Sequence, residues 1–566
     1  MKLLHLGCMI FSGTLLIACN ADEGRGHGGG GGASNDLAGG GGGGGDQDFG
    51  GGLDDGGVFT PDDGSFIVQD PTTCDEAAAN KSYIGCDYWP TVVANAVWSI
   101  FDFAAVVSNP GAMPAMITVT GPNNVNQTVT VMPGTLEKIY LPWVPELKGA
   151  DADAMGGTSG LTASTLKVGG AYHLVSTLPV LVYQFNALEY KNAGGPAGKD
   201  WSKCPGTGMG GNPPCFSYSN DASLLLPSTA MTGNYRVMTI HGVDGIKGFP
   251  PIIPDGPGLS AYIAITATQA STTVKIQVSS TGQIIAGTGV TAVAAGGTAT
   301  FTMNAGDVVQ LVSGAATASD LSGSLVQADK PVQVIGGIPC IANPDSACDH
   351  VEESVQPAET LGKHYVVTMP TGPHDTAVLA TVRFVGNVDG TTLTFTPAVS
   401  GAPATLNAGQ VVNLDTVNTD FVVTGSHEFE VGTMMKSGSV VDPNATMNAE
   451  GDPSLSSMIA VEQYRLKFVF LAPDDYDLNY ADVVAPMNAH LMLDGAAVTT
   501  AGGQVGTTGY AVYRIKLVPG ANAGAHTLES DQPCGVQILG YGSYTSYQYP
   551  GGLNLLSIAP APPPIN

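Results

Sequence analysis

The sequence predicts an all-β protein made of about four tandem β-sandwich modules behind a disordered, Gly-rich N-terminal tether. Charged residues make up 12% of the 566 residues, and the Lys, Glu, Arg and Gln that usually cover helix surfaces are scarce. Short runs of alternating polar and apolar residues recur between turn signals, as expected for strands. These runs also recur in the same order along the chain, which is typical of a repeated module.

The N-terminus has the features of a lipoprotein signal peptide, assigned here to residues 1–18. Lys2 precedes an apolar run at residues 6–17 that is too short and too early for a spanning helix. The run ends in Leu16-Ile17-Ala18-Cys19, which resembles the bacterial lipobox and predicts Cys19 as the lipidation site. An ordinary signal peptide with a chance cysteine is the alternative. Several acyl chains on one residue would give stable membrane anchoring.

Residues 19–65 contain the predicted lipidated Cys19 and a linker dominated by Gly runs, which cannot bury a core. Asn20 is not the Asp that favours inner-membrane retention in enteric bacteria, so we expect display on the outer membrane or cell surface of a Gram-negative bacterium. No strand precedes the Gly runs and no Lys-Ser/Thr follows them, which argues against a nucleotide-binding loop.

The body repeats one series of strand signals four times. The first strand is expected at residues 103–109, 261–268, 377–385 and 479–485, and the second at 115–120, 272–278, 391–396 and 490–494. A third strand opens at Gly134, Gly306, Gly409 and Gly509, where we expect turns with positive φ. The modules are assigned to residues 66–235, 236–365, 366–460 and 461–556, followed by an extended Pro-rich tail at 557–566.

Each unit ends in a strand–break–strand pattern, clearest at residues 320–337, where Asp329-Lys330-Pro331 is the break. Similar stretches are residues 172–186, 420–433 and 526–540. We interpret the pattern as a closing hairpin. Cys534 follows Pro533 as Val332 follows Pro331, so Cys534 is expected to be a buried thiol rather than a reactive or intermolecular one.

Six other cysteines form three close pairs, each around a Gly-, Pro- or Asx-rich loop. Disulfides are the default in an exported protein, and the spacings do not suit zinc. The predicted pairs are Cys74/Cys86, Cys204/Cys215 and Cys340/Cys348.

Three bridging segments precede the second to fourth units, each with an acidic residue two positions before a Ser. They begin at Asp221, Glu352 and Asp452. One reading is a set of equivalent cation-binding carboxylates, and the favoured one is turn chemistry with local backbone bonds. The polar cluster at residues 345–353 would be a disulfide-stapled loop, with Ca²⁺ binding as the alternative. Four late tyrosines would form a contact patch or pack the last strands: Tyr541, Tyr544, Tyr547 and Tyr549.

Catalytic motifs are missing from the sequence: it has no HExxH, G-x-S-x-G, P-loop or EF-hand pattern. We therefore predict no enzyme activity, no catalytic residues, no cofactor and no metal site. The formal net charge of −28 would repel nucleic acid.

Several segments together resemble the IgGFc-binding protein N-terminal region family, over residues 74–556. They are KSYIGCDYWP at 81–90, VYQFN at 182–186, SNDASLLLP at 219–227, DKPV at 329–332, CDHVEE at 348–353, and GYGSY with YPGGLN within 540–554. Bacterial members are typically lipoproteins of soil deltaproteobacteria such as myxobacteria. The resemblance implies an adhesive or binding module without established catalytic residues.

The sequence thus predicts an envelope-anchored binding and adhesion lipoprotein that recognises a protein or glycan ligand through loops, above all those closed by Cys204–Cys215 and Cys340–Cys348. The alternatives are an exported enzyme acting on polysaccharide or peptide, with Asp and Glu as acid and base, and a purely structural envelope protein.

Overall fold

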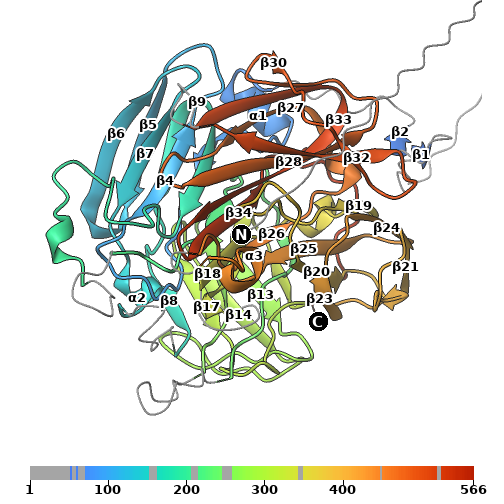
Figure 1. Cartoon of the computed structure of the whole chain (residues 1–566). Coiled ribbons are helices and arrows are strands. Elements are labelled where there is room, and N and C mark those ends of the chain that lie inside the picture. The colour runs from blue at the N-terminus through green and yellow to red at the C-terminus, as the bar shows by residue number, and fades with distance from the viewer. Residues whose placement is uncertain are drawn as a thin grey trace, which may run out of the picture. The chain divides into compact units, whose positions relative to one another are not determined.

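The computed structural model describes residues 51–53, 59–61, 70–151, 162–205, 215–244, 258–341, 349–445, 449–518 and 524–565. These residues form an almost entirely β structure of antiparallel sheets (Figure 1). Two short strands, β1 (Gly51–Leu53) and β2 (Phe59–Pro61), pair ahead of the body. No helix in the described part of the chain has the length and apolar character needed to cross a membrane.

The second module shows the architecture most simply, with eight strands in two sheets. The sheet that contains the first strand of the module has the order β11-β16-β13-β14, and we call it the opening sheet. The sheet that contains the last strand has the order β18-β17-β12-β15, and we call it the closing sheet. The strands are β11 (Asn234–Arg236), β12 (Tyr262–Ala267), β13 (Thr272–Gln277), β14 (Thr298–Met303), β15 (Val308–Val312), β16 (Leu325–Ala328), β17 (Val332–Ile341) and β18 (Asp349–Ser354).

The third module repeats this topology, with an opening sheet β19-β24-β21-β22 and a closing sheet β26-β25-β20-β23. Its elements are β19 (His364–Val367), β20 (Ala380–Gly386), β21 (Thr391–Thr396), β22 (Thr405–Leu406), β23 (Val411–Val417), β24 (Phe421–Gly425), β25 (Phe429–Met435), α3 (Gly438–Val441) and β26 (Leu455–Ser457).

In the first module one long strand, β9, belongs to both sheets. Its first part pairs with β3 and β5, and its second part pairs with β4 and β10. The elements are α1 (Cys74–Ala79), β3 (Gly85–Tyr88), β4 (Phe103–Ser108), β5 (Ala115–Gly121), β6 (Val125–Val131), β7 (Leu136–Leu141), α2 (Pro145–Lys148), β9 (His173–Phe185) and β10 (Ala222–Leu224). A further strand, β8 (Thr165–Lys167), extends the closing sheet of the second module by pairing with β15.

The fourth module uses β33 in the same way. β33 pairs first with β27 and β29, and then with β28 and β34. The strands are β27 (Arg465–Leu471), β28 (Leu478–Pro486), β29 (Leu491–Leu493), β30 (Ala496–Ala497), β31 (Gly503–Gln504), β32 (Tyr510–Leu517), β33 (Ala525–Gly542) and β34 (Thr545–Pro550). The predicted all-β fold of four sandwich modules is therefore confirmed.

The predicted closing hairpin is wrong, because its two strands lie in different sheets. β16 pairs with β11 and β13, whereas β17 pairs with β12 and β18. The amide of Asp329 still bonds to Thr273 of the opening sheet, at 3.1 Å. Pro331 then offers no N–H, and Val332 pairs with Ala267 of the closing sheet. The Asp-Lys-Pro break is therefore a crossing between the sheets of one sandwich.

A tyrosine of the opening strand fixes this crossing in three modules. The hydroxyl of Tyr235 donates to the carbonyl oxygen of Val332 at 2.6 Å. The same bond of 2.6 Å runs from Tyr88 to Val180 and from Tyr365 to Phe429. All three tyrosines are buried. The repeat thus specifies one buried hydrogen bond at each of these crossings.

The positive φ predicted before the third strand is confirmed in all four modules. The angles are 67° at Gly134, 81° at Gly306, 74° at Gly409 and 76° at Gly509. A residue with a side chain would be strained at these φ values, so each turn that leads into the third strand requires glycine.

In the second module, alternate side chains of β13 in the opening sheet enter the core, whereas β12 and β17 of the closing sheet are buried along their whole length. In the second module Ile263, Val274, Val326 and Val334 belong to one buried apolar cluster. In β21, Leu393 is buried while Thr392 and Thr394 face solvent, as the alternation predicts. Cys534 is a buried free thiol in the core of the fourth module, as predicted.

The C-terminal segment is not a free tail. Leu553 and Leu555 join the core that contains the fourth module, and the amide of Ile558 donates to the carbonyl oxygen of Glu359 at 2.8 Å. The chain continues along the second module to Ile565, which is buried. We predicted an extended segment without a core of its own, but did not predict that it packs against the second and fourth modules.

Candidate functional site

The strands that close the four modules meet one another. β10 contacts β18 and β34, and β26 contacts the same two strands. β18 and β34 also contact each other, so each closing strand touches those of at least two other modules. We call the buried polar residues on and beside these strands the hub.

Asp221 ties all four modules together in the hub. Its carboxylate oxygens accept backbone N–H groups from the closing strands of the other three modules. The donors are Glu352 of β18 at 3.1 Å, Leu455 of β26 at 3.3 Å and Gln548 of β34 at 3.4 Å. The adjacent amide of Ala222 donates at 2.9 Å. Asp221 is fully buried, so these donors replace the water that a carboxylate would otherwise bind.

Asp349 of β18 makes a second set of bonds between modules. One oxygen accepts the backbone N–H of Asn220 at 2.5 Å. The other accepts the hydroxyl of Thr545 at 2.9 Å and the N–H of Ser546 at 3.3 Å. The second module is thereby joined to the first and to the fourth.

Glu352 points back toward the first module. Its carboxylate accepts the side-chain amides of Gln184, at 3.1 Å, and Asn186, at 3.3 Å. His350 lies beside it, with its Nε2 3.5 Å from the Glu352 carboxylate. Glu352 and His350 are both fully buried.

Burial dominates the electrostatics of the hub carboxyls. It raises the pKa of Asp221 and of Asp349 well above the usual value, against the lowering effect of the N–H donors. It does the same for the pKa of Glu353 and of Asp452. The described residues include no group of three His, Cys, Asp or Glu side chains arranged to hold a metal ion. The hub carboxyls therefore join the modules through hydrogen bonds.

The turn-chemistry reading of the bridging segments accounts for only part of the bonding of Asp221. The carboxylate accepts the adjacent Ala222 amide, but its other bonds reach strands 131 to 327 positions away. Glu352 lies within β18, and Asp452 is buried just before β26. Asp349, His350 and Glu353 likewise belong to a buried strand rather than to a stapled surface loop. Residues 345–348, the rest of that predicted cluster, lie outside the described residues.

A second buried cluster joins the second and third modules. Arg383 of β20 forms an ion pair with Asp320 and donates to the Ser322 hydroxyl at 2.8 Å. Arg236 of β11 donates to the carbonyl oxygen of Gly323 at 2.9 Å. Burial raises the pKa of Glu430 to about 8, although the charges of both arginines oppose the shift.

Two predicted disulfides are present, Cys74–Cys86 and Cys204–Cys215. Cys340 is also disulfide-bonded, while Cys348 and the predicted lipidation site Cys19 lie outside the described residues. Disulfides persist in oxidising compartments, so these bonds indicate an extracellular protein.

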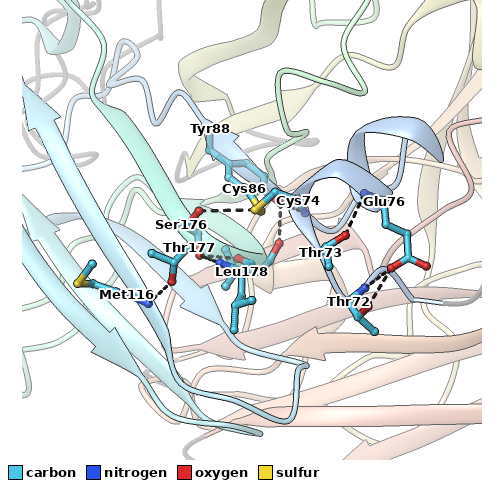
Figure 2. Close-up of a disulfide and its surroundings, with 12 residues drawn as sticks. Thr72, Thr73, Cys74, Glu76, Cys86, Tyr88, Met116, Ser176, Thr177 and Leu178 are labelled. Atoms are coloured by element: carbon cyan, nitrogen blue, oxygen red, sulfur yellow. Dashed lines mark hydrogen bonds between the residues drawn. A yellow bond between two sulfur atoms is a disulfide. The ribbon is translucent and has the colours of Figure 1, made fainter.

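Cys74–Cys86 attaches α1 to β3 beside the bend of β9 (Figure 2). The sulfur of Cys74 lies 3.8 Å from the carbonyl oxygen of Ser176, where β9 leaves the opening sheet. Thr73 caps α1 by accepting the N–H of Glu76 at 3.2 Å. This disulfide therefore braces the sheet crossing of the first module.

Cys204–Cys215 lies in a different setting, an aromatic surface that we call the tryptophan patch. Its half-buried members pack on a small buried cluster that includes Phe101 and Cys215. They are Trp98, Ile100, Trp143 and Trp201. The chain has four tryptophans, so three of them gather at this one disulfide.

Hydrogen bonds and charges hold the patch in place. The Trp143 indole donates to the carbonyl oxygen of Phe101 at 2.8 Å, and the Trp201 indole donates to that of Gly194 at 3.2 Å. The Lys199 ammonium lies 4.6 Å from the centre of the Trp201 ring and pairs with Asp102. The result is a semi-exposed aromatic surface with a fixed cation beside it.

Glu189 lies under this cation. Its carboxylate accepts the backbone N–H of Asp102 at 2.9 Å. Burial, reinforced by the charge of Asp102, raises the pKa of Glu189 to about 8. Glu189 therefore holds its proton more readily than an exposed glutamate would.

Sequence reasoning identified the Cys204–Cys215 loop but not the tryptophans around it. Trp98, Trp143 and Trp201 come from three separate segments, so no local pattern links them. Conversely, Tyr541, Tyr547 and Tyr549 are buried rather than gathered in a contact patch, and the partly buried Tyr544 ring lies 5.8 Å from that of Tyr218.

Comparison with known proteins gives one informative match. The family model described as IgGFc binding protein matches residues 221–540, more than half of the chain. No curated protein matches. Among solved structures, an anti-sigma factor domain-containing protein from Clostridium clariflavum is 9% identical over 78% of this chain and 98% of that one. Its TM-score of 0.11 is too low to carry any argument.

Proposed function

Because the chain belongs to the IgGFc-binding protein family, we propose that it is an exported binding and adhesion protein that recognises a protein ligand through the tryptophan patch. Membership in a family named for binding an immunoglobulin favours a protein ligand. The lipobox-like sequence ending at Cys19 supports anchoring to the outer membrane or cell surface.

The observation that carries this proposal is the clustering of Trp98, Trp143 and Trp201 around a disulfide. Tryptophan is enriched among the residues that contribute most to protein interfaces, because it combines a large apolar surface with one polar group. The Cys204–Cys215 bond ties the segment that carries Trp201 to the buried cluster, which lowers the conformational entropy lost on binding. Semi-exposed indoles also stack on sugars, so a glycan is the second candidate ligand.

We propose a binding role without catalysis. The hub carboxylates accept hydrogen bonds from neighbouring modules. Those carboxylates are buried, which suits assembly of the modules rather than acid–base chemistry on an external substrate.

The test is a binding screen with the chain from Asn20 onward, which lacks the anchor. The screen would present bacterial envelope and matrix proteins, IgG Fc and a glycan array. We expect a protein hit, weakened at least about tenfold by Trp201→Ala combined with Trp98→Ala. Tyr513→Ala is the matched control, since Tyr513 is a half-buried aromatic of the fourth module. No hit, or a hit that the tryptophan substitutions leave unchanged, would refute the proposal.

A further inference from the structure

The C-terminal segment crosses the open face of the opening sheet of the second module. Gln327 of β16 makes most of the polar contacts. Its side-chain amide nitrogen donates to the carbonyl oxygens of Pro562 at 3.2 Å and Pro563 at 3.3 Å. Its amide oxygen accepts the backbone N–H of Ile565 at 2.6 Å. The Gln327 side chain thus pairs with two carbonyl acceptors and one N–H donor of the C-terminal segment.

Two neighbours in the same sheet complete this surface. Lys275 of β13 donates to the carbonyl oxygen of Ile565 at 3.4 Å. Asn234 of β11 accepts a hydrogen bond from Gln327 at 3.2 Å, which orients the glutamine amide. Asn234, Gln327 and Lys275 are directly opposite one another across three strands. The surface is therefore a short polar row that runs across the sheet.

The composition of the docked segment favours a polyproline II helix. Residues 559–564 read Ala-Pro-Ala-Pro-Pro-Pro, in which each residue is a proline or precedes one, so extended conformations are strongly favoured. A polyproline II helix repeats every three residues. Pro562 and Ile565 are buried, while residues 560, 561, 563 and 564 are exposed. Every third side chain thus faces the second module.

The polar row matches the backbone of such a segment. Proline has a carbonyl acceptor but no N–H. The surface correspondingly offers donors to three backbone carbonyls and only one acceptor, which meets the N–H of Ile565. An ordinary peptide would present further N–H groups, whereas a proline-rich one does not.

The equivalent positions of the other modules lack this chemistry. Strand register places Val175, Thr424 and Glu529 where the second module has Gln327. A valine offers no hydrogen bond, a threonine cannot span the same pair of contacts, and a glutamate cannot donate to carbonyls. The surface is thus a property of the second module and not of the repeat.

We propose that the Asn234–Gln327–Lys275 row is a binding site for proline-rich segments of the type Pro-Pro-x-apolar, occupied by the protein's own C-terminal segment. A partner protein with such a segment would bind by displacing it. Because the segment is tethered, its effective concentration at the row is in the millimolar range. The row therefore selects for tightly binding or multivalent partners. This site is separate from the tryptophan patch and does not depend on the ligand proposed there.

The test uses a fluorescent peptide with the sequence of residues 557–566 and full-length protein. Ile565→Asp places a charge where a buried apolar side chain anchors the tether. We expect the peptide to bind this variant at least about tenfold more tightly than wild type, by fluorescence anisotropy. Adding Gln327→Ala should weaken that binding about tenfold or more. Adding Thr424→Ala, the equivalent position in the third module, should not.

Three results would overturn the proposal: no binding to folded Ile565→Asp protein, equal binding to that variant and wild type, or no effect of Gln327→Ala. Hydrogen exchange on the otherwise wild-type chain provides an independent test. Gln327→Ala should speed exchange at the Ile565 amide, while Thr424→Ala leaves it unchanged. An Ile565 amide that exchanges freely in wild type would equally rule the proposal out.

Discussion

The side chain of Asp221 accepts the backbone N–H of Leu455 at 3.3 Å, although 234 positions separate the two residues. One belongs to the first module and the other to the third. The same carboxylate accepts amides from the second and fourth modules. One buried side chain therefore forms hydrogen bonds with the closing strands of all three other modules.

Asp221→Asn should destabilise the protein by about 2–3 kcal/mol, because the new NH₂ group would face backbone donors where an oxygen now accepts them. The measurement is chemical denaturation followed by intrinsic fluorescence. The control is Asp75→Asn, an exposed acid in the first turn of α1. A loss no larger than that of the control would show that the hub does not depend on this carboxylate.

Thermal stability should fall as pH rises from about 5 to about 8. Glu430 and Glu189 both have folded-state pKa values raised to about 8 from a usual 4.5. Between these values the folded protein binds more protons than the unfolded chain, so raising the pH favours unfolding. Glu430→Gln should flatten the dependence in differential scanning calorimetry. A transition temperature that climbs over this range would contradict the assignment.

Tyr235→Phe should cost about 1–2 kcal/mol, because it leaves the buried carbonyl oxygen of Val332 without its donor. The same loss is expected for Tyr365→Phe, which breaks the equivalent bond to Phe429. Tyr513→Phe, at a half-buried position, serves as the comparison. If all three variants unfold at the same denaturant concentration, the tyrosine bonds do not stabilise the crossings.

Cys534→Val should be tolerated within about 1.5 kcal/mol, since the first and second modules carry Val180 and Val332 at this position. The native thiol should also resist modification, because burial raises the pKa of Cys534 to about 12. Titration with a thiol reagent should detect it only after denaturation. Rapid labelling of the folded protein would place the side chain outside the core.

The sequence predicted correctly those features that depend on neighbouring residues in the chain. Alternation located the strands, and the repeat identified the turn glycines and the core position of Cys534. It failed where the outcome depends on which strands pair. The Asp329-Lys330-Pro331 break resembles a hairpin, yet the same residues also allow the chain to change sheets, and only the partners of β16 and β17 decide between the two.

The hub was missed for a related reason. Strands such as β18 are buried on both faces by other modules, so their polar residues show no alternation. Asp221 and Glu352 therefore resembled turn or surface acids, and the tryptophan patch was invisible because its members are far apart in the sequence. Both features arise from tertiary contacts alone.

The ring of closing strands has a mechanical consequence. In a chain of independent modules, tension applied to the two ends would unfold one module after another. Here β34 of the last module packs against β10 of the first, so load entering at one module is shared by the others through the hub. Forced unfolding should therefore show a single event at high force rather than a series of smaller unfolding events.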